Sequence, residues 1–286
     1  MKYSNSDILE RLSVPSADNG IEFTDKRRLR QIEKMLRRSS YKRIKKGNLY
    51  RLYAKKKINK LSNDLILVST HVDSLQTKAL FGSNLKCYHG ILDNAATNAA
   101  IITLMLQEEL TDNVIIGFTG DEERKAYGAR ELAQYLTDNG KMVRFVVLDV
   151  TSYGWKERLD FTIENNFLKR GISHQWAREI LKKANKSGLK WKFISSKVGE
   201  DGEYLDDSLT KELLSTDRVG LGSPLYGYAS GPNESWEYDR QGLSGLSLCL
   251  PCSAKTPEEM HSNRGFEIRK TSYINYMIFL KTILSL

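Results

Sequence analysis

The hydrophobic positions of this chain form short continuous runs that are separated by longer helical patterns. Four runs have the length and the Val, Ile, Leu and Phe content of buried strands: 65–70, 114–119, 143–149 and 246–250. Residues 94–110 lie between the first two runs and are apolar nearly all round, as in a helix buried against a sheet. This alternation predicts an α/β fold: a mixed, largely parallel central sheet flanked by helices on both faces.

Weaker patterns predict the remaining elements. The further helices are expected at 6–12, 25–38, 126–136, 173–186, 206–214 and 269–286, the further strands at 41–45, 49–54, 159–163 and 190–195, and a glycine-rich loop at 220–231. The apolar stretch 273–281 is far shorter than the ~20 residues of a membrane span and contains Asn and Lys, so a packing helix is expected there. We therefore predict no contact with a membrane.

The net charge of +9 is concentrated in one segment. Between Lys26 and Lys60 there are sixteen Lys or Arg residues and one acid, Glu33, so the rest of the chain carries −6. Such a segment could contact nucleic acid, but no nucleic-acid-binding motif accompanies it, and a solvated basic face is the favoured interpretation. The start of the chain has no apolar signal core, and the cysteine count of three is odd, so we expect a cytoplasmic protein with reduced thiols.

Ligand-type residues follow the predicted strands. His71 and Asp73 follow the first strand, Glu122 and Glu123 follow the second, Asp149 ends the third, and His261 lies a short loop after the fourth. Asp93 lies at the start of the apolar helix, where a plain helix cap is the alternative interpretation. Because ligand sites in open α/β sheets gather beyond the carboxyl ends of strands, these side chains are expected to converge.

One Asp, one Glu, one further Asp and two His suit a pair of divalent metal ions, because a carboxylate can supply one oxygen to each ion. Asp93 is the candidate bridge. His71 and Asp149 would bind one ion, and Glu123 and His261 would bind the other.

Two acids remain for supporting roles. Asp73 is predicted to accept a hydrogen bond from the ring of His71 and so to orient it. Glu122 is predicted to be the free carboxylate that takes a proton from water and passes it to the leaving group. Each feature alone is weak evidence, but their order at successive strand ends is specific.

With these motifs the sequence resembles the co-catalytic zinc exopeptidases, the clan that includes the bacterial leucyl and glutamyl aminopeptidase types. The matching segments are 69–74, 90–96, 120–123, 148–151 and 260–262. The resemblance implies two divalent ions, most often Zn²⁺ with Mn²⁺ or Co²⁺ as substitutes, and it implies substrate-binding roles for Glu234 and Tyr238. The sequence departs from the clan pattern at one position, where it has Lys125 and the clan usually has glycine.

The resemblance also bears on domain organisation, because the clan's larger members carry inserts. Asp73 and Asp93 are 20 positions apart, and Asp149 and His261 are 112 positions apart, which leaves little room for an insertion or lid domain. A single catalytic domain over 1–286 is expected. The clan often assembles, so a homo-oligomer is left open.

The leading hypothesis is a dizinc aminopeptidase that hydrolyses the N-terminal peptide bond of peptides. A second hypothesis is an acyl-amide hydrolase or a glutaminyl-cyclase-like enzyme on the same scaffold. A third, from another class, is a catalytically silent metal-bearing protein that binds anionic partners through the segment Lys26–Lys60.

Overall fold

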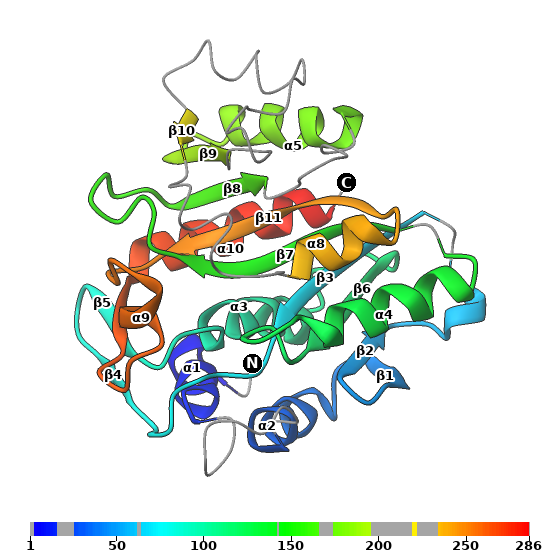
Figure 1. Ribbon diagram of the computed structural model, residues 1–286, viewed down its shortest axis with the longest axis horizontal. Helices are drawn as coiled ribbons and strands as arrows, with labels where there is room; N and C mark the ends of the chain where they lie inside the picture. Colours follow the sequence, from blue (N-terminus) through cyan, green and yellow to red (C-terminus); the bar gives the residue numbers. More distant parts are fainter. Residues whose placement is uncertain are drawn as a thin grey trace.

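A nine-stranded sheet forms the centre of the computed structural model, which describes residues 3–15, 26–61, 64–141, 143–165, 174–195, 219–221 and 234–285 (Figure 1). In sheet order the strands are β1 (Lys42–Lys46), β2 (Tyr50–Ala54), β6 (Val114–Thr119), β3 (Leu65–His71), β7 (Val143–Thr151), β11 (Ser244–Pro251), β8 (Phe161–Asn165), β9 (Trp191–Ser195) and β10 (Val219–Leu221). Of the eight neighbouring pairs, β1–β2, β2–β6 and β8–β11 are antiparallel and the other five are parallel. The predicted mixed, largely parallel sheet is therefore confirmed.

Helices cover both faces of this sheet. The described helices are α1 (Asn5–Leu12), α2 (Lys26–Leu36), α3 (Ala95–Leu106), α4 (Tyr127–Asp138), α5 (His174–Lys186), α8 (Glu234–Arg240), the short α9 (Pro257–Met260) and α10 (Lys270–Leu284), with a 3₁₀ turn at Ile58–Lys60. Successive side chains of a strand point to opposite faces. In β3 the Ser69 hydroxyl contacts Tyr238 of α8, whereas the Thr70 hydroxyl contacts Thr97 of α3, so α8 and α3 lie on opposite faces.

Helix α3 is buried nearly all round, as its sequence predicts. Every residue from Ala95 to Met105 is buried: α1 packs on α3, and α10 packs beside α3 against β11 and β8. Fully burying an Ile or Leu side chain stabilises a fold by roughly 1.5–3 kcal/mol, so this helix is a large part of the core.

A second, three-stranded sheet was not predicted from the sequence. It consists of β12 (Phe266–Arg269), β5 (Cys87–Gly90) and β4 (Phe81–Ser83), with β5 in the middle. Phe266 pairs with Gly90, so the chain just after His261 lies beside the chain that leads into Asp93. This small sheet brings two candidate ligands together from positions far apart in the sequence.

The basic segment forms one edge of the molecule. Strand β1 is the outermost strand, and its four Lys and Arg side chains at 42, 43, 45 and 46 are exposed. Part of the charge is paired, since Arg43 contacts Glu33 and Lys56 lies 2.8 Å from Asp112. Charged side chains on an edge strand also discourage pairing with other chains, which accounts for the segment as a solvated face.

Several predicted boundaries differ from the structure. β7 continues two residues beyond Asp149, and α8 was not predicted. The predicted helix 206–214 lies outside the described residues, as does most of the predicted loop 220–231, of which residues 220 and 221 belong to strand β10. Among the described residues, no helix has both the length and the apolar character needed to cross a bilayer.

Candidate metal centre

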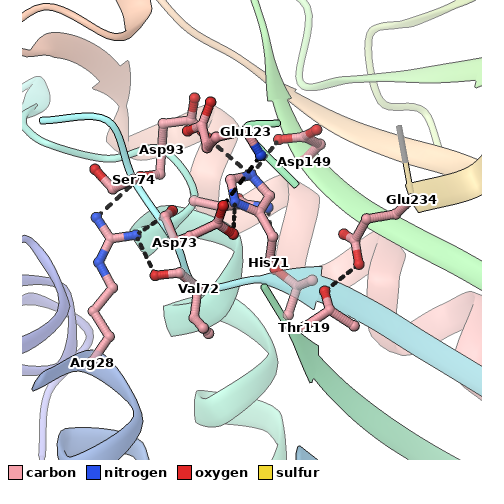
Figure 2. Close-up of polar contacts among 12 residues, drawn as sticks. Arg28, His71, Val72, Asp73, Ser74, Asp93, Thr119, Glu123, Asp149 and Glu234 are labelled. Atoms are coloured by element: carbon pink, nitrogen blue, oxygen red, sulfur yellow. Dashed lines mark hydrogen bonds and ion pairs between the residues drawn. The ribbon is translucent and has the colours of Figure 1, made fainter. Parts of the chain in front are cut away.

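The first group of candidate ligands surrounds the ring of His71, at the carboxyl end of β3 (Figure 2). Its Nε2 lies 3.2 Å from Oδ1 of Asp93 and 3.6 Å from Oδ1 of Asp149. His71 and Asp93 are buried, whereas the side chain of Asp149 is 29% exposed. Each of the three residues offers one ligand atom, and these atoms all lie within 4.8 Å of one another.

The second group shares Asp93 with the first. Nε2 of His261 lies 3.1 Å from Oε2 of Glu123 and 3.6 Å from Oδ2 of Asp93. Asp93 therefore turns one carboxylate oxygen toward each histidine. The ligand atoms of Asp93, Glu123 and His261 also lie within 4.8 Å of one another. Asn94, not Asp93, is the N-cap residue of α3, and no side chain caps that end, so the helix-cap interpretation of Asp93 is not needed.

The other two predicted acids flank these groups. Oδ1 of Asp73 lies 3.5 Å from Nδ1 of His71, and Oδ2 accepts a hydrogen bond of 3.2 Å from the backbone amide of Glu123. Asp73 thus links the strand that carries His71 to the loop that carries Glu122 and Glu123. Glu122 is half-buried and belongs to neither group of candidate ligands.

The loop that carries Glu122 and Glu123 is fixed by close backbone contacts. It leaves β6 at Gly120, whose amide donates to the carbonyl of Leu49, and its own carbonyl accepts from Gly128. A Cβ at Gly128 would lie 2.5 Å from both carbonyl oxygens, so only glycine permits this approach. Lys125, the departure from the clan pattern, is exposed, with its ammonium 5.6 Å from the centre of the Tyr127 ring.

The donor set fits divalent metal ions. One oxygen each of Asp93 and Glu123 is buried without a hydrogen-bond partner among the described residues, although such atoms are usually satisfied. Burial raises the pKa of the Glu123 and Asp149 carboxyl groups, and also that of Glu122. Although burial alone would lower it, contact with Asp93 and Glu123 raises the pKa of His261 to about 11. Imidazole and carboxylate groups crowded in this way are the ligands that zinc prefers.

Glu234 and Tyr238 lie beneath this site, in α8. Both are buried, with exposed fractions of 1% and 0%. Oε1 of Glu234 accepts hydrogen bonds from Ser69 (2.7 Å) and from Thr119, and the Ser69 hydroxyl also contacts the Tyr238 hydroxyl at 2.7 Å. Burial raises the pKa of Glu234 to about 7. The two side chains thus contact β3, the strand that carries His71. The described residues around them bury both side chains.

Three buried residues that support the ligands were not identified from the sequence. Asn98 of α3 donates 2.7 Å hydrogen bonds to the carbonyls of His71 and Asn94, and Asn94 donates one of 2.7 Å to the carbonyl of Leu148. Arg28 of α2 donates to three carbonyls beside the ligands. Asn98 lies four positions after Asn94 on a predicted helix, a spacing that could have indicated it, whereas nothing separated Arg28 from the other basic residues.

Comparison with known protein families identifies the family to which the chain belongs. The sequence profile of peptidase family M28 matches residues 52–198, about half of the chain. The chain belongs to peptidase family M28. Membership confirms the predicted relation to the co-catalytic exopeptidases, and it makes this M28 protein a metallopeptidase. The match includes His71, Asp93, Glu123 and Asp149 and ends before His261.

Solved structures similar to this M28 peptidase confirm its fold at low sequence identity. The Pyrococcus horikoshii TET1 peptidase, described as assembling into a tetrahedron or a large octahedral shell, is 13% identical, with a TM-score of 0.59 over 97% of this chain and 98% of that one. A dodecamer named PhTET1-12s gives 14% identity and 0.62 over 99% of each chain. The Legionella pneumophila LapA aminopeptidase gives 12% and 0.55, over 99% of this chain and 72% of that one. No curated protein sequence matches the chain.

Proposed function

We propose that this M28 peptidase is an aminopeptidase that binds two divalent ions, with Zn²⁺ as the native metal. The observation that carries the proposal is the pair of three-residue groups that share Asp93, each with its ligand atoms within 4.8 Å of one another. Two-metal hydrolases hold their ions ~3.5–4 Å apart, which requires a bridging group of this kind.

In this proposal the ligands divide between the ions. His71 and Asp149 would hold one ion, Glu123 and His261 would hold the other, and Asp93 would be shared by both. The exposed fractions of Asp149 (29%) and His261 (30%) support a site that a substrate can reach. When bound, the ions would polarise the scissile carbonyl and lower the pKa of a water molecule.

The proton chemistry falls to Glu122. It follows β6, beside Glu123, and lies outside both groups of candidate ligands, so its carboxylate is available. It would accept the proton of the attacking water and deliver it to the amine that leaves, the dual role that hydrolysis of an amide requires. Asp73 would hold the His71 ring through Nδ1, so that Nε2 faces the metal.

The experiment combines elemental analysis with turnover of aminoacyl-anilides by the full chain. We expect about two ions per chain and activity that is lost on chelation and restored by Zn²⁺, Mn²⁺ or Co²⁺. Glu122→Gln should keep both ions and lose roughly 10²–10⁴-fold in kcat, the usual contribution of a general base. Glu157→Gln, a change of the same kind at an exposed position, serves as the control. Near-normal turnover in Glu122→Gln with both ions bound would contradict the proposed role.

Adding peptides with N-terminal Gln and blocked amides to the aminoacyl-anilides separates the alternatives. A glutaminyl-cyclase-like enzyme would release ammonia from peptides with N-terminal Gln and would need only one ion, and an acyl-amide hydrolase would prefer blocked amides. Two ions without turnover of any substrate would favour the silent metal-bearing protein. Salt-sensitive binding of a polyanion would then implicate the segment Lys26–Lys60.

We further propose that residues 1–286 form one catalytic domain without a lid, supported by a single central sheet whose strands lie between residues 42 and 251. The shells described for TET1 favour a homo-oligomer, which size-exclusion chromatography with light scattering tests. A cytoplasmic location remains our prediction.

A further inference from the structure

Among the described side chains of the basic segment, that of Arg28, in the first turn of α2, is the most deeply buried charge. Its exposed fraction is 0%, whereas its neighbours Arg27 and Arg30 on the same helix are exposed. A buried cation needs several acceptors to offset the loss of its water shell, so its partners reveal what its burial stabilises.

Within the described part of the chain, the guanidinium of Arg28 joins three separate segments of backbone. Nη1 donates to the carbonyls of Val72 and Asp73 at 3.2 and 3.3 Å, and Nη2 donates to the carbonyl of Asp93 at 3.1 Å. Nε donates to the carbonyl of Val14 at 3.1 Å, in the chain that follows α1. Figure 2 shows Arg28 and Glu234 approaching the His71 segment from opposite sides.

Each residue of the run His71–Asp73, where the chain leaves β3, has a backbone group that is hydrogen-bonded to another part of the molecule. The carbonyl of His71 accepts from Asn98, and the next two carbonyls accept from Arg28. The amide of Val72 donates to Thr119 of β6. Among the described residues, only Arg28 joins this run directly to the carbonyl of Asp93, and Asp93 is shared by both groups of candidate ligands.

We propose that Arg28 is a positioning residue that fixes the distance between the His71–Asp73 run and Asp93, and thereby sets the affinity of the shared metal centre. The inference rests on the proposed function, because it concerns the ions that Asp93 would bridge. Its fixed positive charge also contacts the backbone carbonyls of two acids of the centre, Asp73 and Asp93.

The geometry requires arginine in particular. A guanidinium presents its donors in a rigid planar fork, so that Nη1, Nη2 and Nε can reach three segments at once. A lysine ammonium is a single point of charge on a flexible stem and would reach only some of these carbonyls. Lysine would therefore keep the charge and lose the spacing, which makes the two contributions separable by substitution.

The test measures zinc affinity of the full chain by competition with a chromophoric chelator, for the wild type, Arg28→Met, Arg28→Lys and the exposed control Arg30→Met. Loss of a group that orients metal ligands typically weakens affinity 10–100-fold. We expect a loss of that size in Arg28→Met, a smaller loss in Arg28→Lys and none in Arg30→Met. The visible absorption spectrum of the Co²⁺ form should shift in both Arg28 variants, because it reports ligand geometry.

A purely structural role predicts a different result. It would lower the melting temperature of the metal-free and metal-loaded forms equally and leave the affinity and the Co²⁺ spectrum unchanged, and that outcome would overturn the inference. If Arg28→Met does not fold, Arg28→Lys decides by the same two measurements. Failure of both variants to fold would also refute a specific positioning role. A wild-type chain that binds no divalent ion would instead refute the proposed function itself.

Discussion

Replacing Glu234 by Gln should stabilise the metal-free protein at neutral and alkaline pH but not at acidic pH. The carboxyl group is 1% exposed, and its Oε2 is buried without a hydrogen-bond partner among the described residues. Burial is the main cause that raises its pKa from 4.5 to about 7. Gln has nearly the same shape, keeps an acceptor for Ser69 and Thr119, and never has to carry a charge.

The size of the effect follows from the pKa difference. A carboxyl group with a raised pKa in the folded state binds its proton more tightly there, so its contribution to stability is complete below pH 4.5 and is lost as the pH rises through about 7. Each pKa unit corresponds to about 1.4 kcal/mol, so the 2.5-unit difference between 4.5 and about 7 amounts to roughly 3 kcal/mol at pH 8. Glu234→Gln avoids this loss of stability, because the Gln side chain carries no charge at any of these pH values.

The assay is urea unfolding of the chelator-treated protein, followed by circular dichroism at pH 5, 6, 7 and 8. The free energy of unfolding of Glu234→Gln, minus that of the wild type, should increase by about 2.5 kcal/mol from pH 5 to pH 8, with most of the rise by about pH 7. The control Glu157→Gln makes the same chemical change at an exposed position and should give a difference that is flat. A flat difference for Glu234→Gln as well would refute the argument that this carboxyl group is buried at a cost.

Two further predictions concern the metal centre and the loop beside it. Asp93→Asn should lose both ions, because both candidate groups include Asp93, whereas Asp149→Asn should lose one, and elemental analysis of the two purified variants distinguishes the cases. Equal loss in the two variants would contradict the shared role of Asp93. Gly128→Ala should destabilise the fold by about 1–3 kcal/mol, because its Cβ would lie 2.5 Å from the carbonyl oxygens of Gly120 and Leu49. Denaturant unfolding measures this cost, and an unchanged midpoint would show that the backbone there can move.

Much of the candidate site was visible in the sequence because it depends on local pattern. A continuous apolar run predicts a buried strand, and residues at the ends of parallel strands share one edge of the sheet. That rule alone was enough to select His71, Glu123 and Asp149 as neighbours. The all-apolar helix after Asp93 was equally clear, because a helix without a polar face has to be buried on all sides.

Other parts of the molecule depended on contacts that no local pattern encodes. The small sheet that joins Gly90 to Phe266 has strands of three and four residues, too short for a recognisable alternation, and they are stabilised by pairing with each other. Glu234 belongs to the short helix α8. The position of this helix beside β3 becomes evident only from the structure, in which the Ser69 hydroxyl donates a hydrogen bond to Glu234.

The basic segment shows most clearly which features the sequence predicts and which depend on tertiary contacts. Its composition predicted a charged surface, and strand β1 is one. Sequence alone could not distinguish Arg28 from its neighbours, because a cation is buried only where several carbonyls already converge to accept it. The sequence determined the strands and the candidate ligands at their ends, whereas the tertiary structure decided which arginine lies beside these candidates, since that depends on where distant backbone segments meet.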